Sequence, residues 1–276
     1  WEMLVGHLPA QTTTVGKPWF ARPGFKPSQR TALVIGAGLA GCASAASLAA
    51  RGWQVTLLER HAELAAEASG NPQGVLYMKL SAHGTVLSQL ILSGFGYTRR
   101  LLPQLPQITD WQACGVLQLG FDAVEQARQA ALTAIFADDL LHTVDQAQAQ
   151  ALAGVKLPAG GLFFPEAGWV NPPGLCQLMA NHPNIQLRTH QHALELRKTA
   201  DGWQAWQGEQ LLATAAVVVL AGAADVCQFT QTAHLPLKRI RGQISYLPAT
   251  ATSQALQTVV CAEGYVAPAR HGMHTL

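Results

Sequence analysis

Apolar residues fall into short runs separated by polar and glycine-rich stretches, and the spacing within each run predicts its secondary structure. A buried strand at 31–35, a helix at 39–50 and a second strand at 54–58 come first. Two more helices are predicted at 85–102 and 172–180, and the other predicted strands are 115–120, 161–164, 185–189, 193–198, 202–206, 212–220 and 243–247. The valine run within 212–220 is typical of a strand buried on both faces. Because helices and strands alternate early and strands dominate later, we expect an α/β fold in which a mixed sheet interrupts a parallel one.

One apolar stretch has nearly the length of a membrane span. Residues 32–50 carry no charge and lie between Arg30 and Arg51. The stretch begins with the β-favouring Leu33-Val34-Ile35, contains three glycines and ends in alanines. We therefore expect a buried strand, a tight turn and a helix at this place, and no membrane partner.

A glycine motif follows the first strand. Gly36-Ala37-Gly38-Leu39-Ala40-Gly41 matches GxGxxG, in which the first glycine permits a tight turn, the second lets a pyrophosphate approach and the third lets the helix pack closely. The free N–H groups of the helix start favour phosphate. Glu59 closes the second strand 21 residues after Gly38, where a carboxylate can accept both ribose hydroxyls. The segment predicts a Rossmann-like dinucleotide site, and we include Arg60 in it.

A second segment distinguishes FAD from NAD. Ala68-Ser69-Gly70-Asn71-Pro72-Gln73-Gly74 resembles the stretch that lies along the pyrophosphate and flavin in FAD-dependent amino-acid oxidases. The predicted cofactor residues here are Ser69, Gly70, Asn71, Gln73 and Gly74. Val217-Val218-Val219-Leu220-Ala221-Gly222-Ala223 resembles the later strand and small-residue turn of the same class, which adds Ala221 and Gly222. The resemblance implies a fold of the glutathione-reductase and amino-acid-oxidase type that binds FAD.

Composition and charge narrow the class of protein. Of 276 residues, 49% are hydrophobic and 12% are charged, so the chain can bury a core without disulfides or metal. The five cysteines are scattered, which is typical of reduced thiols in a cytosolic protein, and neither they nor the ten histidines show zinc spacing. We therefore expect no metal. Two segments, 3–58 and 238–276, are basic; they fit either a polyanionic partner or an ordinary solvated surface.

The order of motifs over nearly the whole chain resembles one family in particular. These motifs are Glu2-Met3-Leu4-Val5-Gly6, Pro18-Trp19-Phe20, the glycine motif, Ser69-Gly70-Asn71-Pro72-Gln73-Gly74-Val75-Leu76-Tyr77, Gly115-Val116-Leu117-Gln118-Leu119-Gly120, Gly168-Trp169-Val170, Arg241-Gly242-Gln243 and Gly264-Tyr265. Together they are similar to the bifunctional tRNA 5-methylaminomethyl-2-thiouridine biosynthesis (MnmC) family. The resemblance implies a cytoplasmic protein in which an S-adenosylmethionine-dependent methyltransferase precedes an FAD oxidase.

This resemblance also implies a domain division and a reaction. We expect a linker and methyltransferase tail at 1–29, an FAD-binding domain at 30–85 and 165–235, and an incomplete substrate domain at 86–164 and 236–276, within a longer protein. The family's oxidase removes the carboxymethyl group from 5-carboxymethylaminomethyl uridine at the tRNA wobble position. Hydride leaves the methylene carbon for the flavin, and hydrolysis of the imine gives a primary amine and glyoxylate. The amine is then methylated.

The substrate carboxylate needs a cation, and Arg241 is the candidate because it leads a predicted strand near the flavin end. Tyr77, Lys79 and His83 are further candidates for lining the pocket, with surface or packing roles equally open. A free-standing FAD amine oxidase for glycine or sarcosine would use the same motifs. A non-catalytic flavin- or RNA-binding module and an NAD-dependent dehydrogenase are further alternatives, and the segment from Ser69 to Gly74 disfavours the dehydrogenase.

Overall fold

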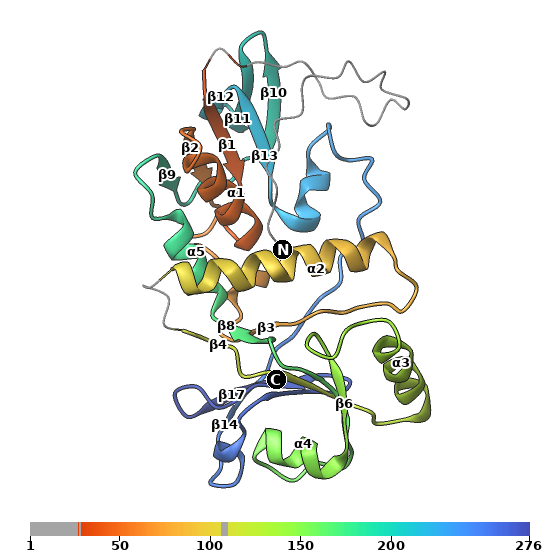
Figure 1. Cartoon of the computed structure of the whole chain (residues 1–276). Helices are drawn as coiled ribbons and strands as arrows, with labels where there is room; N and C mark the ends of the chain where they lie inside the picture. The colour runs from red at the N-terminus through yellow and green to blue at the C-terminus, as the bar shows by residue number, and fades with distance from the viewer. Residues whose placement is uncertain (1–26, 28, 106–109) are drawn as a thin grey trace.

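The computed structural model describes residue 27, residues 29–105 and residues 110–276. Figure 1 shows two bodies of β-structure, one above and one below the long helix α2 (Val86–Leu101). The upper body is built on the first strands of the chain, and the lower body contains the end of it. The predicted linker and methyltransferase tail at 1–29 lie almost entirely outside the described residues.

The upper body is a parallel sheet between two different layers. Its strand order is β13 (Val217–Leu220), β1 (Thr31–Ile35), β2 (Gln54–Leu58) and β9 (Ile185–Arg188), and every pairing is parallel. Helices α1 (Leu39–Ala49) and α5 (Pro172–Ala180) pack on one face. The antiparallel strands β10 (Glu195–Thr199), β11 (Gly202–Gln207) and β12 (Gln210–Ala215) cover the other.

Successive side chains of β1 point alternately toward the helical layer and toward the antiparallel layer. Ala32 and Val34 contact the helical layer, whereas Leu33 and Ile35 contact the antiparallel layer, and Leu33 and Val34 are fully buried. The strand, turn and helix expected across the apolar stretch 32–50 are therefore confirmed. In the described part of the chain, no helix combines the length and the apolar character that a membrane crossing requires.

The lower body contains a five-stranded mixed sheet. Its order is β16 (Tyr265–Val266), β15 (Val259–Cys261), β5 (Val116–Leu119), β7 (Gly161–Phe164) and β6 (His142–Val144). Helices α3 (Ala123–Thr133) and α4 (Gln146–Ala153) belong to this body, and β14 (Tyr246–Pro248) pairs with β17 (Met273–Thr275). A small sheet, β3 (Gly74–Leu76), β8 (Gly168–Val170) and β4 (Trp111–Gln112), joins residues from both sides of the proposed domain boundaries. The short 3-10 turns are η2 (Ala68–Gly70), η3 (Leu102–Gln104), η4 (Ala223–Gln228) and η5 (Ser253–Ala255).

Two predicted strands require correction. The single strand at 212–220 is two strands, because the chain changes sheets at Ala216, whose N–H donates to the Thr31 hydroxyl at 3.0 Å. The valine run forms β13 at the edge of the parallel sheet and is half-buried, so it is not buried on both faces. The strand predicted at 243–247 is observed at Tyr246–Pro248, where β17 provides its partner.

Candidate cofactor site

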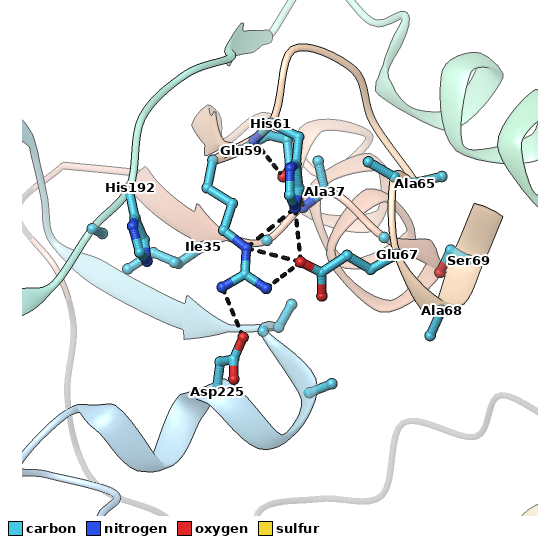
Figure 2. Close-up of a pocket in the computed structure, with 18 of the residues that line it drawn as sticks. Ile35, Ala37, Glu59, His61, Ala65, Glu67, Ala68, Ser69, His192 and Asp225 are labelled. Atoms are coloured by element: carbon cyan, nitrogen blue, oxygen red, sulfur yellow. Dashed lines mark hydrogen bonds and ion pairs between the residues drawn. The ribbon is translucent and has the colours of Figure 1, made fainter. Parts of the chain in front are cut away.

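A pocket lies where β1, β2 and β13 end, at the carboxyl edge of the parallel sheet. It encloses about 130 Å³. Its walls come from the glycine turn, the segment after β2, the loop between β9 and β10, and the segment that follows β13 (Figure 2). Crevices at this edge of open α/β sheets are the usual ligand sites of such folds.

The glycine turn has the geometry that its motif predicts. Gly36 has φ +101°, and an added Cβ would lie 2.8 Å from the carbonyl oxygen of Ala221. A Cβ at Gly41 would lie 1.8 Å from the carbonyl oxygen of Gly36, so α1 could not pack this closely on the turn with any larger residue. A Cβ at Gly38 would lie 2.9 Å from the Ser69 hydroxyl. Close packing around the turn therefore requires a glycine at all three positions, and Gly36 and Gly38 line the pocket.

Glu59 connects the end of β2 to the glycine turn. Its carboxylate accepts hydrogen bonds from the N–H of Ala37 and the N–H of His61, both at 2.9 Å, and the residue is 7% exposed. Each carboxylate oxygen has a second lone pair that these bonds leave available. The carboxylate lines the pocket, so it can accept two further hydrogen bonds from a ligand such as a ribose diol.

Arg60 reaches across the pocket between two acids. Its guanidinium pairs with Glu67 on one side and, at 2.8 Å, with Asp225 of η4 on the other (Figure 2). His61 also contacts Glu67, at 2.7 Å, and Arg239 pairs with Asp225. Hydrogen bonds from His61 and then Arg60 lower the pKa of the Glu67 carboxyl, and Glu67 raises the pKa of Arg60. Arg60 therefore stays charged beside the Glu59 carboxylate.

Ser69 lies at the start of α1. Its hydroxyl accepts the N–H of Leu39 at 3.0 Å, so the segment predicted to follow the pyrophosphate is in contact with the helix end predicted to bind it. After Ser69, the side chains of Asn71 and Gln73 form hydrogen bonds with residues of the lower body. The Asn71 amide donates to the Tyr265 hydroxyl at 2.8 Å, and the buried Gln73 bonds to the Pro268 carbonyl and the Thr275 hydroxyl, both at 3.0 Å.

The structure brings about half of the predicted cofactor residues into the pocket. Gly36, Gly38, Glu59, Arg60, Ser69, Ala221 and Gly222 line it. Leu39, Ala40, Gly41, Gly70, Asn71, Gln73 and Gly74 are not among its lining residues. A Cβ at Gly70 would lie 2.8 Å from the Ala65 carbonyl, and one at Gly74 would lie 2.9 Å from a Pro172 ring carbon, so both positions require close packing.

The candidate substrate residues lie elsewhere. Arg241 is exposed in the segment that connects the two bodies, away from the pocket, and regular strand begins only five residues later. Tyr77 packs edge-on against Phe164 in the core of the lower body, and burial raises its pKa. Lys79 and His83 are exposed. None of the four lines the pocket.

Several pocket residues were not predicted as cofactor residues, although Ala37, Ala68 and Ala223 lie within the quoted motifs. They are Ile35, Ala37, His61, Ala65, Ala66, Glu67, Ala68, Gln191, His192, Ala193, Ala223, Asp225, Gln228 and Phe229. Most of those far from the motifs follow β9 and β13, whose place beside β1 and β2 cannot be read from local patterns. Backbone strain marks the region: Ala65 and Ala223 have positive φ (56° and 49°), as does His190 (56°), next to Gln191.

The pocket fits one half of a dinucleotide. It offers the small-residue backbone of Gly36 and Gly38 and a carboxylate with unused lone pairs, and His192 is a further lining residue, whose buried Nε2 atom has no hydrogen-bond partner among the described residues. The described residues contain no group of three or more His, Cys, Asp or Glu that could hold a metal ion. All five cysteines are free thiols, and burial raises the pKa of Cys114 and of Cys261 from 9.0 to about 11.

Comparisons with known proteins agree with this geometry. The model of the FAD dependent oxidoreductase family matches residues 31–276. The whole chain is 65% identical to "tRNA 5-methylaminomethyl-2-thiouridine biosynthesis bifunctional protein MnmC" from Pseudomonas fluorescens and to the protein of that name from Pseudomonas putida, and it spans 42% of the length of each.

Solved structures show the same fold. The glycine oxidase of Geobacillus kaustophilus aligns with a TM-score of 0.71 at 19% identity, and that of Bacillus cereus with 0.73 at 18%. Each alignment covers 90% of this chain and 70% of the other. Because the family model matches residues 31–276, the chain belongs to the FAD-dependent oxidoreductase family, and the glycine turn and the Glu59 carboxylate are consistent with it.

Proposed function

We propose that the chain is the FAD-binding part of an oxidase that acts on the wobble uridine of tRNA. In this proposal it removes the carboxymethyl group from 5-carboxymethylaminomethyl-(2-thio)uridine and leaves the aminomethyl form for methylation. The 65% identity to the MnmC relatives along the whole chain carries the proposal. The pocket supports it, because the Glu59 carboxylate and the small-residue turn both line it.

The residues of the pocket would bind and orient the adenosine half of the cofactor. When bound, FAD supplies an acceptor for the hydride that leaves the methylene carbon of the carboxymethyl group. The N-terminus of α1 and the backbone of the glycine turn would face the pyrophosphate, and Glu59 the ribose. Arg241 remains the candidate for the substrate carboxylate, since it is exposed on the segment that connects the two bodies.

tRNA and a methyltransferase domain are the partners that this proposal requires. The basic segment 238–241 is exposed and provides Lys238 and Arg239 for phosphate contacts. Binding that depends on such contacts weakens as salt rises, because each contact releases counterions from the nucleic acid. The methyltransferase domain would occupy part of the length by which the relatives exceed this chain.

Anaerobic bleaching of the flavin absorbance tests the reaction. The full-length protein is mixed with tRNA bearing the carboxymethylaminomethyl group and, separately, with glycine and with sarcosine. We expect rapid bleaching with the modified tRNA alone. Bleaching only with the free amino acids would replace the proposal with a small-molecule amine oxidase. A protein that binds FAD but is bleached by none of the three would favour the non-catalytic module.

A further inference from the structure

One face of helix α2 is apolar and is left uncovered by the described part of the chain. Val86, Leu90 and Tyr97 follow one another at spacings of four and seven residues and so lie in one row, and Leu87 lies beside it. Their exposed fractions are 80%, 68%, 59% and 64%, in that order. Single exposed apolar residues are ordinary, whereas four on one helix face indicate a surface that contacts another molecule or domain.

A different face of α2 packs within the chain. Ile91 and Leu92 pack against the core of the lower body, and Phe95 is buried in that core. Figure 1 shows that α2 extends between the upper and the lower body. The helix therefore has two apolar faces, and only the face with Phe95 has its partner among the described residues.

The chemistry of the exposed face indicates a protein partner. The helix contains no charged residue from Val86 to Thr98. Its cations, Arg99 and Arg100, stand in the last turn, and Arg99 pairs with Glu166. Nucleic acids and anionic membrane surfaces are bound through several cations, which residues 86–98 do not provide. The exposed face therefore fits an apolar surface of another protein domain.

The small size of this face favours a domain of the same polypeptide over a second copy of the protein. Separate proteins that form a specific complex bury about 800 Å² each, or roughly 20–30 residues a side. The exposed face of α2 has four large apolar residues, which is far fewer. A domain on the same polypeptide needs less contact area, because the covalent link already holds the two surfaces at a high effective concentration.

The relatives have enough additional chain for such a domain. This chain covers 70% of the glycine oxidases but only 42% of the MnmC relatives, whose name describes them as bifunctional. The relatives therefore contain more chain than the shared oxidase fold requires. We propose that the exposed face of α2 is the docking surface for the methyltransferase domain. The inference rests on the proposed function, which requires that domain, and adds the place where it contacts the oxidase part.

Photocrosslinking in the full-length protein tests this surface. A benzophenone side chain in place of Leu90 should attach to the methyltransferase domain on irradiation, and peptide mass spectrometry identifies the residue that it reaches. The same side chain in place of Val124, which is 79% exposed on α3, is the control and should not attach to that domain. The yield should not depend on protein concentration, because both surfaces belong to one polypeptide.

A charge within the row separates docking from chance contact. With the benzophenone in place of Val86, Leu90→Glu should reduce attachment by roughly tenfold, because docking would bury an unpaired charge. Val124→Glu should leave the attachment unchanged. FAD affinity should be the same in Leu90→Glu as in the unsubstituted protein, since Leu90 is exposed and does not line the pocket.

Three results would overturn the assignment: attachment only within the oxidase part, attachment to a second copy of the protein, or no attachment from α2. An attachment that is equally strong in Leu90→Glu would also contradict it. Crosslinking needs neither tRNA nor reduction of the flavin, so this inference can fail while the bleaching test supports the proposed reaction, and the reverse.

Discussion

Glu59 has two partners that its place in the sequence does not predict. The fingerprint indicates a carboxylate for ribose, and the structure adds hydrogen bonds from the N–H groups of Ala37 and His61. These N–H groups belong to the glycine turn and to the segment after β2, so one side chain fixes both walls of the pocket. Loss of the carboxylate should therefore affect the apoprotein as well as the binding of FAD.

Substitution of Glu59 by alanine tests both roles. We expect FAD affinity to fall by about 1.5–3 kcal/mol, or roughly ten- to a hundredfold, as for a charged hydrogen bond. The apoprotein should also melt at a lower temperature, because the buried N–H of Ala37 and the part-buried N–H of His61 lose their acceptor. Titration with FAD and thermal unfolding measure the two effects, and the exposed Glu63→Ala is the control. Nearly unchanged affinity would remove Glu59 from the cofactor site.

At the scale of elements, local patterns predicted the βαβ unit with bounds that agree to within one residue of the structure. This succeeded because strand, turn and helix are adjacent in sequence and each has its own signal. Helices α3 and α4 were missed although Asp122 and Asp145 cap them, and Gln148 completes a capping box. The division between β12 and β13 depends on which sheet each strand joins, and that is decided by distant partners such as Thr31.

The contact between α1 and the glycine turn leads to a prediction about that element. In Gly41→Ala the added methyl group would overlap the Gly36 carbonyl, so α1 must move away from β1. Overpacking of this kind typically costs about 1–3 kcal/mol, and FAD binding should weaken as the helix N-terminus shifts. Denaturant unfolding and FAD titration measure the two effects.

Gly94 in α2 provides the matched control. A Cβ at this exposed helical position meets nothing within 4 Å, so Gly94→Ala should stabilise the protein by about 0.4–1 kcal/mol through helix propensity. Equal effects of the two substitutions would show that the close approach at Gly41 does not constrain the fold.

At the scale of the whole molecule, the segment predicted to follow the cofactor is tied to the far end of the chain. Sequence placed Ser69 at the pocket, but it also predicted Gly70 and Gly74 there, and these two glycines instead allow close packing against Ala65 and Pro172. The contacts of Asn71 and Gln73 could not be predicted, because their partners lie 194 to 202 residues later. The Tyr265 hydroxyl also donates to the Gln73 carbonyl at 3.3 Å. The segment therefore links the pocket of the upper body to the strands of the lower body.

Because of this link, a substitution at Gln73 should affect both the stability of the lower body and the binding of FAD in the upper body. Gln73 is 1% exposed, and its side chain donates to the Pro268 carbonyl and accepts from the Thr275 hydroxyl. Gln73→Leu keeps the size of the side chain but leaves both buried partners without their hydrogen bond. The free energy of unfolding should therefore fall by about 1–3 kcal/mol. FAD should also bind more weakly, because the segment loses its anchor. The exposed Gln210→Leu should change neither property.

A double-mutant cycle with Thr275→Val separates the link from a general loss of packing. If the hydrogen bond between Gln73 and Thr275 carries the coupling, the double variant should be less destabilised than the sum of the two single variants, by about 0.5–3 kcal/mol. Strictly additive losses would mean that the two residues act independently. Weaker FAD binding in Thr275→Val would be the more informative result, since this hydroxyl lies in β17 and is not part of the pocket. The effect could then reach the cofactor only through the segment that Gln73 anchors.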